Sequence, residues 1–161
     1  SRSRERRTFP LREAVEETVR LIKAEVPASI DLQIDIPEDL TVYADRQKIQ
    51  QVIINLIKNA VDATEGEGRI RVLASKLDEK NLEIVVIDSG AGMSPEKLEK
   101  IFNPFFTSKK EGYGLGLFIV HNIITENGGT VSVDSYPGKG TTFTIVLPMI
   151  EIKAPQEPEE S

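Results

Sequence analysis

The longest helical pattern in the sequence, over residues 45–64, most constrains the fold. Its apolar side chains recur at helical spacing and form one stripe, made of Ile49, Val52, Ile53, Leu56, Ala60 and Ala63. A helix with a single apolar stripe has to bury that stripe against a second layer of structure. The run Glu-Gly-Glu-Gly at 65–68 ends the helix. The rest of the chain must therefore provide the covering layer.

Strand patterns on both sides of this helix predict that the second layer is a β-sheet. Apolar and polar residues alternate strictly over 30–36, which indicates a half-buried strand. Further strands are expected at 40–43, 69–77, 81–88, 130–135 and 141–147. Other helices are expected from Leu11 to before Pro27 and over 115–127. This irregular order predicts an α+β fold, with helices layered over a mostly antiparallel sheet.

Composition narrows the function classes. The 161 residues carry a net charge of −6, which argues against a protein whose main ligand is nucleic acid. The chain has no cysteine, so disulfides and thiolate sites are excluded, and its single histidine is too few for a typical zinc site. No apolar run approaches the roughly 20 residues that a membrane span needs. We therefore expect a cytoplasmic domain without membrane contact.

Three regions are expected along the chain. Residues 1–8 are polar and suggest a linker or the end of a preceding helix, residues 9–148 form one domain, and the acidic, proline-containing tail at 149–161 is expected to be disordered. Within the domain, residues 89–116 contain five glycines and two prolines. Such a long loop inside a compact domain is usually functional or mobile.

Polar side chains at the edge of the long helix are the first candidates for chemistry. Asn55, Asn59 and Asp62 lie at positions i, i+4 and i+7, beside the apolar stripe. Asparagine in mid-helix costs roughly 0.6 kcal/mol relative to alanine, so two of them one turn apart need a reason. Amide oxygens can coordinate a hard cation such as Mg²⁺. The alternative is that both amides are satisfied by water or by a neighbouring loop.

An aspartate follows the apolar strand at 81–88 and precedes alternate glycines. Asp88 is followed by Gly90, Gly92 and Met93. A carboxylate fixed at a strand end suits the exocyclic amino group of adenine, and glycines allow the backbone to approach a flat ligand. The alternative is an Asx-type turn in which the glycines only supply positive φ.

Glycines also open the helix expected at 115–127. The motif comprises Gly112, Tyr113, Gly114, Leu115, Gly116 and Leu117. A helix start of this kind directs free N–H groups toward a phosphate, although neither a dinucleotide fingerprint nor a Walker A loop is present. Polar and cationic side chains lie just upstream, at Thr107, Ser108, Lys109 and Lys110. The alternative for these charges is a solvated face.

Aromatic residues gather inside the long loop. Phe102, Phe105 and Phe106 are three of the six phenylalanines of the chain. They could anchor the loop to the body of the domain or offer a surface to a partner. Anchoring is the simpler interpretation.

Taken in this order, the motifs resemble those of the histidine-kinase ATPase domain, within the wider group of gyrase, heat-shock chaperone and MutL ATPases. Residues 55–60 look like its N box, 88–93 its G1 box and 102–106 its F box. Residues 112–117 look like its G2 box and 138–143 its final glycine box. The resemblance covers residues 9–148. Its lid segment is most similar to that of the nitrogen-regulator type.

The resemblance implies a two-layer α/β sandwich, the Bergerat ATP-binding fold, with a mixed sheet, three main helices and a flexible ATP lid. It implies Asn59 as Mg²⁺ ligand and catalytic residue, Lys109 as catalytic phosphate ligand, and Asp88 as partner of the adenine amino group, supported by Thr141. The full set of implied ATP-site residues is Asn55, Asn59, Asp62, Asp88, Gly90, Gly92, Met93, Phe102, Thr107, Ser108, Lys109, Lys110, Gly112, Tyr113, Gly114, Leu115, Gly116, Leu117 and Thr141.

One position favours a kinase over its hydrolytic relatives. Those relatives have a water-activating glutamate where this chain has Asn55, and a neutral amide is not a general base. The resemblance then implies phosphoryl transfer to a histidine on a separate dimerisation domain, relay to a response regulator, and a homodimeric full-length protein. His121 lies in a predicted helix without an acidic neighbour, so we do not expect it to be the acceptor. The alternatives are a gyrase- or chaperone-type ATPase, a pure nucleotide-binding module and a serine-kinase anti-sigma factor.

Overall fold

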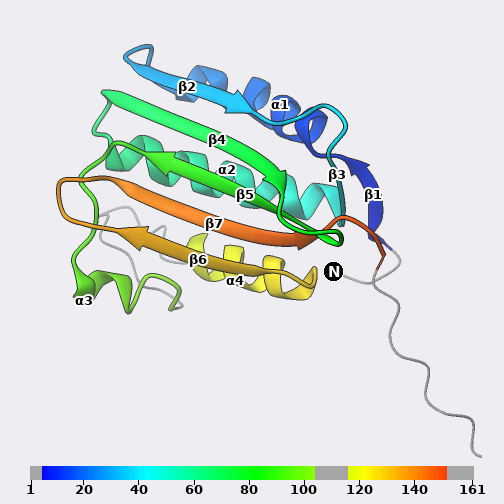
Figure 1. Cartoon of the computed structure of the whole chain (residues 1–161). Coiled ribbons are helices and arrows are strands. Elements are labelled where there is room, and N and C mark those ends of the chain that lie inside the picture. Colours follow the sequence, from blue (N-terminus) through cyan, green and yellow to red (C-terminus); the bar gives the residue numbers. More distant parts are fainter. Residues whose placement is uncertain (1–4, 104–115, 152–161) are drawn as a thin grey trace, which may run out of the picture.

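A mixed sheet of five strands forms one layer of the molecule (Figure 1). The computed structural model describes residues 5–103 and 116–151. The strands lie in the order β2 (Ile30–Asp35), β4 (Gly68–Lys76), β5 (Asn81–Asp88), β7 (Thr141–Pro148) and β6 (Thr130–Ser135). Only the β2–β4 pair is parallel, and the other three pairs are antiparallel. The predicted α+β fold with a mostly antiparallel sheet is therefore confirmed.

Three helices form the second layer, on one face of the sheet (Figure 1). They are α1 (Leu11–Ile22), α2 (Arg46–Ala63) and α4 (Gly116–Glu126). The predicted stripe of α2 is buried except for Ala63, which is half-buried at the helix end, and Ile57 joins it. The apolar residues on the covered face of β4, β5 and β7 complete the core, as period-two alternation requires. A short 3₁₀ helix, η2 (Lys23–Glu25), follows α1.

A second sheet, of two strands, lies at the N-terminal end of α1, and one of its strands was not predicted. Strand β1 (Arg7–Pro10) pairs antiparallel with β3 (Thr41–Ala44). The polar composition of residues 1–8 predicts a linker, but residues 7 and 8 belong to this strand. Only Phe9 of the four residues is buried, so the strand has no apolar alternation to detect. Its pairing with a segment more than 30 residues away determines it instead.

A buried asparagine joins α4 to α2, its neighbour in the helical layer. Asn127, which is 2% exposed, follows α4 directly. Its Oδ1 accepts a hydrogen bond from the backbone N–H of Asp45 at 2.9 Å, and its Nδ2 donates to the carbonyl of Ile123 at 2.8 Å. Asp45 in turn caps the N-terminus of α2 by accepting from the N–H of Lys48. The end of α4 is thereby fixed to the start of α2.

The long loop after β5 is described as far as residue 103. Its one described helix, α3 (Pro95–Leu98), is capped by the hydroxyl of Ser94, which accepts from the N–H of Lys97 at 3.2 Å. Residues 104–115, which contain the second half of the predicted lid at about 94–113, and the predicted tail from residue 152 lie outside the described part of the chain. Across the described residues, none of the helices is both long and apolar enough to span a membrane.

Candidate functional site

Several predicted motifs meet at one end of the sandwich, at the left of Figure 1. Strands β5 and β6 and helix α2 end there, and β7 and α4 begin there. The residues at this end include Asp88, the last of β5, and Thr141, the first of β7. Because residues far apart in the sequence converge here, this end of the fold is the candidate site.

The loop after Asp88 is packed tightly against the end of α2. The N–H of Ala91 donates to the carbonyl of Ala63 at 3.0 Å. A Cβ atom on Gly90 would collide with the same carbonyl group. The first glycine of the motif is therefore required by the approach of helix backbone. The motif alone suggests close approach to a flat ligand instead.

The second glycine is required by the turn between β6 and β7. Gly92 has φ +70°, and a Cβ atom there would collide with the carbonyl of Tyr136. The N–H of Gly138 donates to the carbonyl of Ala91 at 2.6 Å, so the turn and the loop are joined by their backbones. The loop is thus held between α2 on one side and the predicted final glycine box on the other. This packing keeps the end of β5 in one place.

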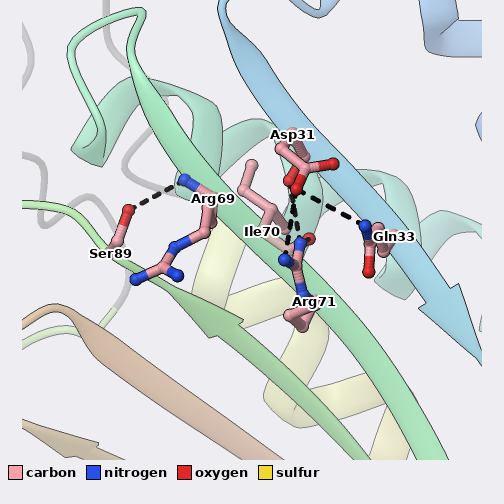
Figure 2. A network of polar contacts seen from close by, with 6 residues as sticks. All are labelled: Asp31, Gln33, Arg69, Ile70, Arg71 and Ser89. Carbon is pink, nitrogen blue, oxygen red and sulfur yellow. Dashed lines mark hydrogen bonds and ion pairs between the residues drawn. The ribbon is translucent and has the colours of Figure 1, made fainter.

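Ser89 fixes the same loop to the neighbouring strand. Its Oγ accepts from the N–H of Arg69 at 2.8 Å, and its own N–H donates to the carbonyl of Arg69 at 3.1 Å. Figure 2 shows the first of these bonds beside an ion pair between Arg71 and Asp31, which joins β4 to β2 at 3.2 Å. The exit of the chain from β5 is therefore anchored on the neighbouring strand β4.

Asp88 is a buried carboxylate, only 6% exposed. Burial raises the pKa of Asp88, while hydrogen bonds from the backbone N–H groups of Gly90, at 2.8 Å to Oδ1, and of Thr141 lower it. Within the described residues, no ion pair compensates this carboxylate. Its position opposite Thr141 in the β5–β7 register places both side chains on the covered face of the sheet. Asp88 is therefore held as an acceptor at a fixed point of the site.

A row of buried polar residues continues from Asp88 across the sheet. Thr141 lies opposite Asp88 on one side and opposite Ser135 on the other. Ser135 Oγ and Thr141 Oγ1 are 2.8 Å apart, and the N–H of Met93 donates to Ser135 Oγ at 2.9 Å. Ser135 did not emerge from the sequence, where it was one serine among others in a predicted strand. No local pattern could have indicated it, because its partners come from three separate segments.

The predicted cation ligands line a pocket on the outer side of α2. The pocket has a volume of about 320 Å³ and is bounded by α2, by the end of α1 with η2, and by the start of α4. Asn55, Asn59 and Asp62 line it together with Gly116. The structure thus brings these four predicted residues together. Asp88 is not among the described residues that line this pocket, so the two ends of the predicted site are distinct.

Asn55 links α2 to the first residue of α4. Its Nδ2 donates to the carbonyl of Gly116 at 3.4 Å, a long hydrogen bond. Lys58, which also lines the pocket, forms an ion pair with Glu25 at 3.6 Å, between side chains that are both more than half exposed. The pocket therefore offers amide groups from α2 together with exposed charged side chains.

Phe102 anchors the beginning of the predicted F box. Its ring centroid lies 5.9 Å from that of His121 on α4 and 6.4 Å from that of Phe143 on β7. Phe102 also packs against the core. For this residue the anchoring interpretation is confirmed. His121 itself is exposed.

The remaining predicted site residues lie outside the described part of the chain. They are Thr107, Ser108, Lys109, Lys110, Gly112, Tyr113, Gly114 and Leu115, and the other two phenylalanines of the F box fall in the same segment. Leu117, in the first turn of α4, is described and half-buried against the core.

Comparisons with known proteins agree with this architecture. The family described as histidine kinase-, DNA gyrase B-, and HSP90-like ATPase matches residues 44–151. The sensor histidine kinase ZraS of Salmonella typhimurium is 39% identical over 145 residues, which cover 89% of this chain and 31% of that protein. The chain thus spans about a third of the length of this curated relative.

Solved structures give the same result. The catalytic domain of histidine kinase ThkA superposes with a TM-score of 0.81 at 36% identity, covering 89% of this chain and 95% of that one. ThkA in complex with the response regulator protein TrrA superposes with a TM-score of 0.77 at 34% identity, covering 90% of this chain and 42% of that one. This chain therefore belongs to the family of histidine kinase-, DNA gyrase B- and HSP90-like ATPases, and its relatives within that family are histidine-kinase catalytic domains.

Proposed function

We propose that this chain is the ATP-binding catalytic part of a two-component sensor histidine kinase, which transfers the γ-phosphoryl group of Mg²⁺-bound ATP to a histidine on a separate dimerisation domain. The observation that carries the proposal is the amide of Asn55, which lies in the α2 pocket and donates to the Gly116 carbonyl. An amide cannot take a proton from water at neutral pH. The site therefore suits transfer to another nucleophile better than hydrolysis.

The adenine ring would be recognised at the Asp88 end. A buried carboxylate without a cation partner among the described residues favours a ligand that donates hydrogen bonds, as the 6-amino group does. The glycines at 90 and 92 are committed to backbone packing, so they keep the carboxylate in place. Met93 and Thr141 are both hydrogen-bonded to Ser135, which holds them beside Asp88.

Mg²⁺ and the phosphates would lie at the α2 pocket. The amide oxygens of Asn55 and Asn59 are hard ligands of the kind that Mg²⁺ accepts alongside water and phosphate oxygens. Bound there, the cation would neutralise charge on the phosphates. The first turn of α4, beginning at Gly116, would add its N–H groups, and Lys109 is the proposed further phosphate ligand. Phosphoryl transfer depends mainly on such positioning and charge neutralisation.

The acceptor and the partners follow from the same proposal. His121 is exposed on α4 and contacts the ring of Phe102, which gives it an anchoring role. The acceptor histidine would belong to a dimerisation domain of the full-length protein, a homodimer, and the phosphoryl group would pass to a response regulator. The complex of ThkA with TrrA supports that last step by analogy.

The test is phosphotransfer in trans with radiolabelled ATP. The chain should bind ATP, hydrolyse it very slowly and fail to label itself. Mixed with a histidine-bearing dimerisation domain, it should produce acid-labile label on that domain, and His121→Gln should leave this transfer largely intact. Brisk hydrolysis by the isolated chain would reject the kinase proposal in favour of an ATPase. Label on the isolated wild type that vanishes in His121→Gln would instead make His121 the acceptor.

A further inference from the structure

Ser135 occupies the centre of the hydrogen-bond network beside Asp88. It is the last residue of β6 and is 5% exposed. Its Oγ lies within hydrogen-bond distance of three groups, the N–H of Met93 at 2.9 Å, the carbonyl of Gly140 at 2.9 Å and Oγ1 of Thr141 at 2.8 Å. These three groups belong to the loop after β5, the turn after β6 and the start of β7.

Counting protons fixes the direction of each bond. A serine hydroxyl has one hydrogen and two lone pairs. The N–H of Met93 can only donate, so it uses one lone pair. The carbonyl of Gly140 can only accept, so it takes the hydrogen. The contact with Thr141 must then run from the Thr141 hydroxyl into the second lone pair of Ser135.

This assignment decides what Thr141 can offer to a ligand. Its single hydroxyl hydrogen is committed to Ser135, so its oxygen has only lone pairs left. Asp88, directly opposite in the register, accepts hydrogen bonds through its carboxylate. The edge of the site formed by Asp88 and Thr141 therefore consists of acceptors.

We infer that Ser135 is a positioning residue that makes Thr141 an acceptor and so helps the site to select a 6-amino purine over a 6-oxo purine. The inference rests on the proposed nucleotide binding and adds the origin of its base selectivity. A 6-amino group donates toward the two acceptors, directly or through a bound water, whereas a 6-oxo group is itself an acceptor. Without Ser135, the Thr141 hydroxyl can rotate and donate to the 6-oxo oxygen.

Ser135 also joins three backbone segments, so the test has to separate selectivity from stability. The affinities of the full chain for ATP and for inosine triphosphate, both with Mg²⁺, should be measured by calorimetry. Ser135→Ala should narrow the ratio of the two affinities by about three- to tenfold, the range for one neutral hydrogen bond. Ser135→Thr keeps the hydroxyl and should restore most of the ratio. Ser132→Ala, an exposed serine on the same strand, should leave the ratio unchanged.

A purely structural role gives a different result. If Ser135→Ala weakens both nucleotides by the same factor, or if Ser135→Thr fails to restore the ratio, the inference is wrong. A second measurement uses the wild type and does not depend on the variant folding. The hydroxyl proton of Thr141 should exchange slowly enough to be observed by NMR without nucleotide, and exchange as fast as in an exposed threonine would overturn the inference. Wild type that binds neither nucleotide would reject the proposed function instead, while the proton measurement still decides whether Ser135 holds Thr141.

Discussion

Replacing Asn127 by alanine should destabilise the fold more than any exposed change on α4. Alanine would leave the buried N–H of Asp45 without its acceptor, which costs about 1–3 kcal/mol. It would also remove the bond to the carbonyl of Ile123, which still accepts from the backbone N–H of residue 127, so this loss adds no more than about 1 kcal/mol. We expect a total loss of about 1–4 kcal/mol in the free energy of unfolding.

The assay is thermal and urea denaturation of the full chain, followed by circular dichroism. For a domain of this size each kcal/mol shifts Tm by about 2–4 °C, so Tm should fall by about 2–16 °C. Asn127→Asp keeps an acceptor for Asp45 but turns a buried carboxylate toward the Ile123 carbonyl, so at neutral pH it should be at least as damaging. Asn122→Ala, exposed on the same helix, is the matched control and should change stability by less than about 0.5 kcal/mol. An Asn127→Ala variant as stable as that control would refute the argument.

Three further predictions concern the candidate site. Asn59→Ala should abolish most of the Mg²⁺-dependent part of ATP affinity without loss of helix propensity, and calorimetry showing unchanged affinity in a folded variant would count against the metal role. Asp88→Asn should weaken ATP binding by roughly 1.5–3 kcal/mol. Burial raises the pKa of Asp88 in the folded state. The stability of wild type relative to Asp88→Asn should therefore be greatest in acid and should decline as pH rises through the folded pKa. Parallel curves of stability against pH for the two proteins would contradict this. Gly92→Ala should lower the free energy of unfolding by about 1 kcal/mol or more beyond the loss in Gly66→Ala. Both glycines have positive φ, but only a Cβ atom at Gly92 would collide with another carbonyl, that of Tyr136. Equal losses for the two variants in urea denaturation would show that this contact is loose.

The elements that the sequence predicted well are those whose own periodicity reports their burial. α2 shows a period of 3.6 because one of its faces packs on the sheet, and β2 shows a period of two because its apolar residues are the more buried ones and its polar residues are exposed. Strand β1 was missed because a single buried residue, Phe9, leaves no period. Its partner β3 lies far along the chain, so only the tertiary structure reveals the pairing.

In the candidate site, too, some residues could be predicted from local sequence, and others depend on the tertiary structure. Asn55, Asn59 and Asp62 were predicted to lie together because one helix fixes their spacing, and they do line one pocket. Asp88 was found because it ends an apolar strand. The contribution of Ser135 depends on the sheet order β5-β7-β6, which chain order does not determine. The glycines at 90 and 92 were recognised, but the backbone that packs against them comes from α2 and from the β6–β7 turn, which the sequence could not place beside them.

Three of the residues that point to a nucleotide carry a cost for the stability of the fold. Two asparagines in mid-helix each cost roughly 0.6 kcal/mol relative to alanine. Asp88 is a carboxylate whose pKa is raised by burial, so its ionised form is disfavoured in the folded chain. Asp88 is the last residue of β5, and the two asparagines lie in the second half of α2, which ends at the same end of the sandwich. Natural sequences depart from local optima of this kind mainly at functional sites. A ligand that donates to Asp88 and brings a cation to the asparagines would offset these costs, and Mg²⁺-bound ATP has both properties.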